Sequence, residues 1–137
     1  LVRVYPEAAV LPAEPAVRAR VLGAAMIMAS DVHPVNNLKV INHLKSMGHD
    51  QEACVDWMQH WMHEGLTAYA ASIEPSAPFS FGDAPDLADI CLVAQLYNAH
   101  RWGLDLAPFA RLTEIEARCL ALPAFDAARP ETQMDAQ

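Results

Sequence analysis

The stretch DLADICLVAQLYNAHRWG at residues 86–103 carries the start, the body and the end of one long helix. Asp86 can accept a hydrogen bond from the backbone three residues on, and Asp89 can reach back to the amide of Asp86. Both charges suit the positive end of a helix dipole, and Gly103 ends the pattern. The body is nearly apolar for three turns, with an expected inward face of Leu87, Ile90, Cys91, Ala94 and Tyr97. The stretch therefore predicts a helix buried at the centre of the fold.

The rest of the chain follows a helical pattern as well. It contains 25 alanines and 14 leucines with few glycines or β-branched residues, which favours helices over strands. Helices are expected over 15–30, after a bend at Pro34 up to Gly48, over 50–73, and after Pro108 and Pro123. The first of these has a stripe at spacings of three and four, made of Val17, Val21, Ala25, Met28 and Val32. Asp50 can cap the helix over 50–73. The helix after Pro108 is expected to turn four side chains inward: Phe109, Leu112, Ile115 and Cys119. The predicted fold is an all-α bundle of about five helices.

Length and charge exclude several classes of protein. With 137 residues, 53% hydrophobic and 19% charged, the chain suits one soluble domain, and no apolar run reaches the ~18 residues of a membrane span. A net charge of −8 disfavours nucleic-acid and anionic-membrane partners, so an anionic ligand needs local cations. Cys54, Cys91 and Cys119 are odd in number and widely spaced, which indicates reduced thiols in a cytoplasmic protein without a secretion signal.

A polar run, His33, Pro34, Asn36 and Asn37, interrupts a helix at its most apolar stretch. His33 and Asn37 are one turn apart and so share a face. Two interpretations stay open at this point: the polar groups satisfy the helix ends and bound water, or the interruption marks a ligand site. Lys39 and Arg101 are the cations near polar breaks, although such charges are most often solvated surface.

Other polar groups give no catalytic motif. His60 and His63 lie three apart beside Trp57 and Trp61, but a third ligand at helical spacing is lacking, so packing is favoured over a metal site. The cysteines fall on or beside inward faces without a near histidine, which disfavours a catalytic thiol. The sequence has no glycine-rich phosphate loop, no GxSxG and no kinase motif.

Three segments resemble the C-terminal helical domain of zeta-class glutathione transferases, the class that includes the maleylacetoacetate and maleylpyruvate isomerases. They are SDVHPVNNLKVINHL at 30–44, DLADICLVAQLYNAHRWGLDLAPF at 86–109 and LPAFDAARPETQMDA at 122–136. The HPxNN bend and the QxYNAxR run point to the zeta class, whereas the capped Leu-Ala-Asp helix is shared more widely. The likeness runs from about Tyr5 to Ala136.

The resemblance implies a domain organisation and a reaction. The family's N-terminal thioredoxin-like domain has no counterpart in the sequence, so the chain is expected to be a C-terminal piece. Residues 1–14 would be a linker remnant, 15–130 the helical domain and 131–137 a polar tail. The implied protein is a cytoplasmic homodimer that uses glutathione to isomerise a dicarboxylic keto acid from cis to trans, and its thiol is activated in the other domain.

The resemblance also assigns binding roles. His33 and Asn37 would contact glutathione or substrate, Arg101 would bind a substrate carboxylate, and Lys39 would stand where the family usually has arginine. Asp31 would reach the neighbouring subunit's glutathione amine. The sequence departs from the family at Asp86, where threonine is usual, and at Ala94, where proline is usual, and neither change touches the chemistry. Two alternatives remain: a non-catalytic helical interaction module, and a general glutathione-conjugating transferase acting on α-halo acids.

Overall fold

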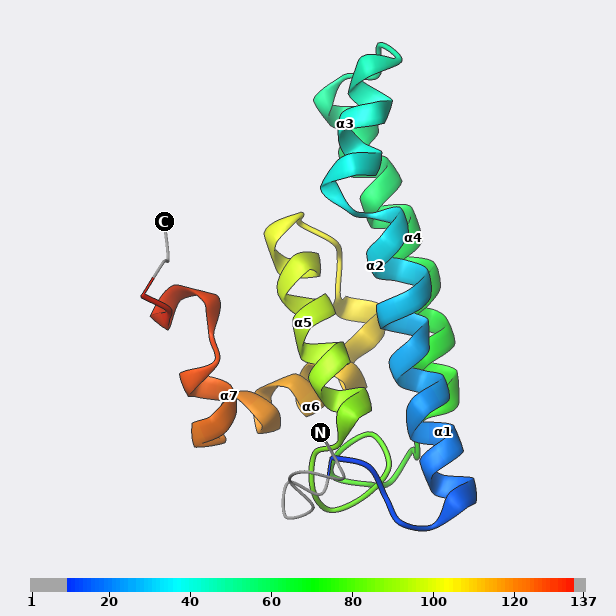
Figure 1. The fold of residues 1–137 in the computed structure, drawn as a ribbon, viewed down its shortest axis with the longest axis vertical. Coiled ribbons are helices and arrows are strands. Elements are labelled where there is room, and N and C mark those ends of the chain that lie inside the picture. The colour runs from blue at the N-terminus through cyan, green and yellow to red at the C-terminus, as the bar shows by residue number, and fades with distance from the viewer. Residues whose placement is uncertain (1–9, 135–137) are drawn as a thin grey trace.

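The computed structural model describes residues 10–134, and every regular element in that range is helical. The all-α prediction is confirmed. Figure 1 shows residues 15–35 as one helical rod alongside the long helix Gln51–Ser72. The helix Leu87–Arg101 lies next to the rod, and the C-terminal helices lie on the side of that helix away from the rod. In chain order the elements are α1 (Pro15–Met26), the π-helical η2 (Ile27–Val32), α2 (His33–Val35), α3 (Leu38–Ser46), α4 (Gln51–Ser72), α5 (Leu87–Arg101), the 3₁₀ turn η3 (Ala107–Phe109), α6 (Ala110–Leu120), α7 (Pro123–Ala127) and the 3₁₀ turn η4 (Pro130–Thr132).

The predicted domain limits stay a prediction. Helical structure begins at Pro15 and ends with η4, which crosses the predicted boundary at residue 130. The expected linker lies partly outside the described residues, but its end is tied to the bundle, because the carbonyl of Val10 accepts a hydrogen bond from the amide of Leu87 at 2.9 Å.

The first rod consists of α1, η2 and α2 and runs without a break to Val35. The carboxylate of Glu14 caps its start by accepting from the amides of Ala16 and Val17, at 3.0 and 2.7 Å. The expected inward stripe is confirmed, with Val21, Ala25, Met28 and Val32 buried. The bend expected at Pro34 is replaced by the wider π turns of η2 before it, and the rod ends only at Asn36. The polar run therefore stands at the end of the rod.

The long helix α4 packs along the first rod and also contacts α3 and α5. Asp50 caps it by accepting from the amide of Ala53 at 2.9 Å, as its sequence position predicts. Gly48 follows the C-cap of α3 at φ +98°, a left-handed conformation that suits glycine. The buried stripe of α4 contains Met58, Met62, Leu66 and Tyr69, and Ile73 continues it at the C-cap. These side chains pack against the rod, α5 and the turn before α5.

Helix α5 has the predicted cap but not the predicted inward face. The carboxylate of Asp86 accepts from the amide of Ala88 at 2.8 Å, and that of Asp89 accepts from the amides of Asp86 and Ser80 at 2.9 and 3.0 Å. Burial, and then the charge of Asp89, raise the pKa of Asp86 to about 6. The capping box expected from the sequence is confirmed.

The face of α5 that packs inward is a different one from that expected. Its buried apolar side chains are Ala88, Leu92, Leu96 and Ala99, and buried Asp89 and Gln95 share their face. Ile90, Ala94 and Tyr97 are exposed instead, and Leu87 and Cys91 are half-buried. The prediction was wrong because both faces of this helix are apolar, and the small alanines of the buried face let α5 pack closely on α1. The other apolar face of α5 is thus left outside the core and stays partly exposed.

Helix α6 closes the core with the stripe that the sequence predicts. Phe109, Leu112, Ile115 and Cys119 are all buried. Among residues 10–134 no helix combines the length and the hydropathy that a bilayer crossing requires.

Candidate functional site

A polar cavity of about 270 Å³ lies where the first rod ends. It is bounded by the end of the rod, by the middle of α4 and by the last turn of α5. The lining residues are His33, Asn36, Asn37, Met58, Asn98 and Trp102. The cavity therefore joins two of the sequence-predicted site residues, His33 and Asn37, with residues that the sequence analysis did not select.

Two opposite walls of the cavity meet through side-chain nitrogens. Nε2 of His33, on the rod, lies 3.5 Å from Nδ2 of Asn98, on α5. The Asn98 amide donates when Nε2 carries the lone pair, and the distance is at the outer limit of a hydrogen bond. A ligand oxygen that enters the cavity can therefore compete for the Asn98 amide at little cost.

Asn37 has a structural role as well as a place in the cavity wall. Its Oδ1 accepts from the backbone amide of Lys39 at 3.1 Å, so Asn37 is the N-cap of α3. The side-chain NH₂ group is not used by this cap and can donate to a ligand. Asn37 thus satisfies a helix end, as the first interpretation of the polar run predicts, and it also lines a cavity.

Asn36 supplies an acceptor. Its Nδ2 lies 3.4 Å from the carbonyl of Met58, while its buried Oδ1 has no hydrogen-bond partner among the described residues. A buried carbonyl oxygen without a partner costs free energy, and a ligand N–H in the cavity would remove that cost. The site therefore offers an acceptor at Asn36 beside donors at Asn37 and Asn98.

Helix α4 holds both walls of the cavity in place. Nε1 of Trp57 donates to the carbonyl of Val35 at 3.0 Å, at the end of the rod. Nε2 of Gln59 donates to the carbonyl of Trp102 at 2.8 Å, just after the end of α5. Trp57 and Gln59, two positions apart on α4, thus fix the distance between the end of the rod and the end of α5.

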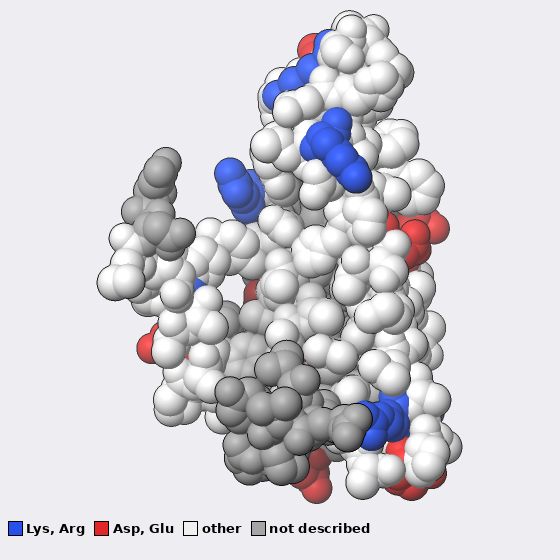
Figure 2. Space-filling view, viewed as in Figure 1, with Lys and Arg blue, Asp and Glu red and all other residues white. Residues whose placement is uncertain are grey.

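The three charged residues expected at the site lie outside the cavity lining. Arg101 is exposed, but its guanidinium carbon lies 5.5 Å from the ring centroid of Trp102, which does line the cavity. Lys39 and Asp31 are exposed on α3 and η2. Figure 2 shows Lys and Arg groups over α3 and near the end of α5, in the upper part of the molecule, and a further group low on α1. The chain is acidic overall, yet the surroundings of the cavity carry these local cations.

Asn98 and Trp102 are the site residues that sequence reasoning missed. Both lie in the QLYNAHRW run that was used to identify the helix, and they are four positions apart, so they share a face of its last turn. This spacing was available from the sequence. Its meaning depends on which end of α5 meets the end of the rod, and only the tertiary structure gives that.

Comparison with known proteins identifies the family. No protein-family model matches the chain. The chain is 40% identical over 131 residues to the maleylacetoacetate isomerase of Pseudomonas aeruginosa, covering 96% of this chain and 61% of that protein. It matches the crystal structure of maleylpyruvate isomerase from P. aeruginosa PAO1 with a TM-score of 0.94 and 42% identity, over 99% of this chain and 73% of the other. The chain belongs to the zeta class of glutathione transferases.

A further similar structure was solved with ligands bound. The maleylacetoacetate isomerase of Anaeromyxobacter dehalogenans was crystallised with bound dicarboxyethyl glutathione and citrate, and this chain matches it with a TM-score of 0.95 and 38% identity, over 100% of this chain and 62% of the other. Three curated isomerases that the zeta-class chain matches are covered over 58–64% of their length. The chain thus spans about three-fifths of these relatives.

The cysteines of this zeta-class chain are poor nucleophiles. Cys54 and Cys119 are buried. Burial raises the pKa of the Cys119 thiol to about 12, and burial together with the charge of Asp86 raises that of Cys91. No group of three metal-binding side chains occurs in the described part of the chain. The described residues therefore offer binding groups and no activated thiol.

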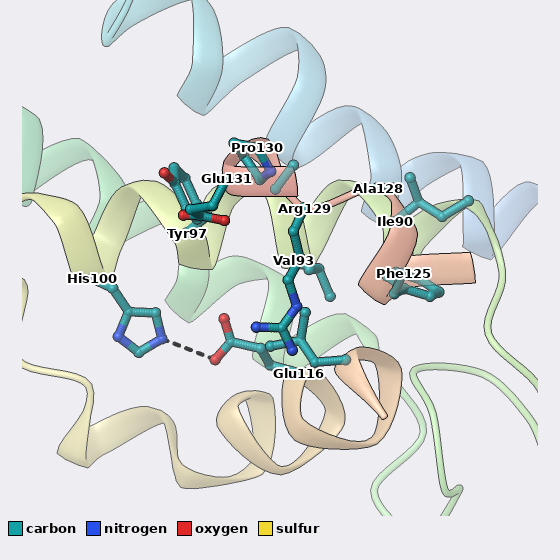
Figure 3. Close-up of a pocket in the computed structure, with 12 residues that line it drawn as sticks. Ile90, Val93, Tyr97, His100, Glu116, Phe125, Ala128, Arg129, Pro130 and Glu131 are labelled. Atoms are coloured by element: carbon teal, nitrogen blue, oxygen red, sulfur yellow. Dashed lines mark hydrogen bonds and ion pairs between the residues drawn. The ribbon is translucent and has the colours of Figure 1, made fainter. Parts of the chain in front are cut away.

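A second hollow, of about 510 Å³, lies on the apolar face of α5 that points away from the core (Figure 3). Ile90, Val93 and Tyr97 line it from α5, and Phe125 and the segment around Pro130 line it from the C-terminal side. At one end Nε2 of His100 lies 3.0 Å from Oε2 of Glu116. Apart from this end its walls are largely apolar, which contrasts with the polar cavity at the end of the rod.

Proposed function

We propose that this chain is the electrophile-binding half of a glutathione-dependent enzyme that isomerises maleylacetoacetate or maleylpyruvate from cis to trans. The observation that carries the proposal is the polar cavity in which His33, Asn37 and Asn98 converge at the end of an otherwise apolar rod. The names of the similar proteins give the reaction and the substrates.

Glutathione fits the groups that line the cavity. The unpartnered Oδ1 of Asn36 suits a peptide N–H, which glutathione has and the keto acids lack. The amides of Asn37 and Asn98 suit carboxylate oxygens, which both compounds have. Bound glutathione supplies a thiolate, whose addition turns the substrate double bond into a single bond that can rotate.

The residues of this chain bind and polarise the keto acid. Negative charge develops on the substrate carbonyl during thiolate addition, and donors held in place beforehand favour that transition state. Asn37 and Asn98 supply side-chain N–H groups, with the Asn98 amide held against Nε2 of His33, and Arg101 beside Trp102 attracts a substrate carboxylate. Lys39 adds positive charge nearby, and Asp31 faces the glutathione amine of a second subunit.

A thioredoxin-like domain supplies the activated thiol in this proposal. The partly exposed apolar face of α5 and the hollow on it, with Ile90 and Tyr97 exposed by 42% and 39%, support a domain contact there. The active protein is a cytoplasmic homodimer of such two-domain chains.

The test is turnover of maleylacetoacetate and maleylpyruvate by the protein that carries both domains, with and without glutathione. We expect conversion to the trans isomer only with glutathione, which is not consumed. Equal rates without glutathione would contradict the proposal. Stoichiometric glutathione consumption, with an α-halo acid as the preferred competitor, would identify a conjugating transferase instead.

A further inference from the structure

Gly65 on α4 packs directly against Val32, the last residue of η2. Both are buried, Val32 with 2% exposure. A methyl group at position 65 would overlap Cγ2 of Val32 and lie 3.5 Å from its Cβ. Gly23 on α1, by contrast, has no atom within 4 Å of the place that its methyl group would take. A glycine is therefore required at 65 for a packing reason that does not apply at 23.

Val32 has little freedom to move aside. A β-branched residue in a helix has one strongly preferred side-chain rotamer. Both Val32 and Gly65 belong to packed helices, so crowding at this contact must be relieved by a shift of the rod against α4. His33 follows Val32 directly and would shift with it.

The segment after His33 is attached to the same helix. Trp57 donates to the carbonyl of Val35, and Asn36 to that of Met58. Helix α4 thus holds the rod at Val32 on one side of His33 and at Val35 and Asn36 on the other. A shift at Val32 alone would tilt the imidazole relative to Asn98.

We infer that Gly65 is a positioning residue: its missing side chain sets how closely Val32 approaches α4, and so sets the place of His33 in the cavity. This inference rests on the proposed function of that cavity. Small misplacements of a binding group lower catalytic rates strongly, because reacting groups must lie within a few tenths of an ångström of the productive geometry.

The test compares four variants of the protein that carries both domains: Gly65→Ala, Val32→Ala, the double variant Gly65→Ala/Val32→Ala, and the control Gly23→Ala. The readouts are kcat/KM for the keto acid, Tm, and the ring ¹H–¹⁵N correlation of His33. The double variant removes Cγ2 of Val32, the methyl group that overlaps position 65, and leaves Cβ of residue 32 at an ordinary contact distance of 3.5 Å.

We expect Gly65→Ala to lower kcat/KM at least tenfold and to shift the His33 correlation, and the double variant to restore both to within threefold and to the wild-type position. Gly23→Ala should change neither. Where Gly65→Ala does not fold, Val32→Ile crowds the same contact by one carbon and takes its place.

Unchanged kcat/KM and an unchanged His33 correlation in the folded variant would overturn the inference, as would a recovery of Tm without recovery of either readout in the double variant. If the wild-type protein has no isomerase activity, the proposed function fails, and the His33 correlation still decides whether Gly65 positions this ring.

Discussion

Nε2 of His33 and Nδ2 of Asn98 lie 3.5 Å apart across the cavity, although 65 residues separate them in the chain. The contact joins the end of the first rod to the last turn of α5. It brings a ring nitrogen and an amide, each with hydrogen-bonding capacity, to one polar space beside an otherwise apolar core.

Replacing Asn98 by alanine should lower kcat/KM for the keto acid about tenfold or more, because one donor at the developing negative charge is lost. Asn42→Ala is the matched control, since Asn42 is exposed on α3 and does not line the cavity. Steady-state kinetics on the two-domain protein measures both. If Asn98→Ala and Asn42→Ala have equal effects on kcat/KM, Asn98 does not take part in the site.

Asn37 should show two separable effects. Asn37→Asp keeps a capping oxygen but loses the amide donor, so we expect a Tm close to wild type and a loss of activity of at least tenfold. Asn37→Ala loses cap and donor, and should also lower the free energy of unfolding by about 1 kcal/mol. Urea unfolding and kinetics on both variants check this. Full activity in the aspartate variant would limit Asn37 to its capping role.

Arg101 should act on substrate binding more than on the chemical step. Arg101→Ala is expected to raise KM for the dicarboxylic substrate about tenfold with a smaller change in kcat, because a charge-assisted hydrogen bond is lost. Arg101→Lys should recover part of the loss, since it keeps the charge without the planar fork. Lys45→Ala removes the same charge from exposed α3 and serves as control. If KM is the same in Arg101→Ala as in the wild type, Arg101 does not bind the substrate.

Asp86 should make stability depend on pH. Its pKa is raised from 3.8 to about 6 in the folded protein, so the folded state binds more protons than the unfolded state between pH 4 and 6. Stability from this group therefore falls as the pH rises through that window, and the penalty is complete above about pH 6. Asp86→Asn keeps a capping oxygen and should flatten this part of the profile, as measured by urea unfolding at several pH values. Profiles of the wild type and the asparagine variant that run parallel between pH 4 and 6 would contradict the assignment.

The sequence predicted the cap and the buried stripes better than the site. Val21, Met28, Leu112 and Ile115 were placed correctly because their helices have one apolar face each. For α5 the pattern was ambiguous, since Tyr97 and Leu96 belong to two apolar faces and only packing selects one. His33 and Asn37 were found because they interrupt an apolar run.

Asn98 was missed for a different reason. A polar residue in the last turn of a helix is ordinary in sequence, and it becomes notable only when the fold brings it to within 3.5 Å of His33. The place of Arg101 at the rim likewise depends on the ring of Trp102 beneath it. Contacts between distant segments carry this information, and local spacing does not.

The most direct test of the central claim follows the side-chain amides of Asn36, Asn37 and Asn98 by ¹H–¹⁵N NMR while dicarboxyethyl glutathione is added to the two-domain protein. We predict saturable shifts of these amides and of the His33 ring. The account would be contradicted by saturable binding that shifts none of these three amide signals and not the His33 ring signal, with shifts confined to residues around the second hollow such as Tyr97.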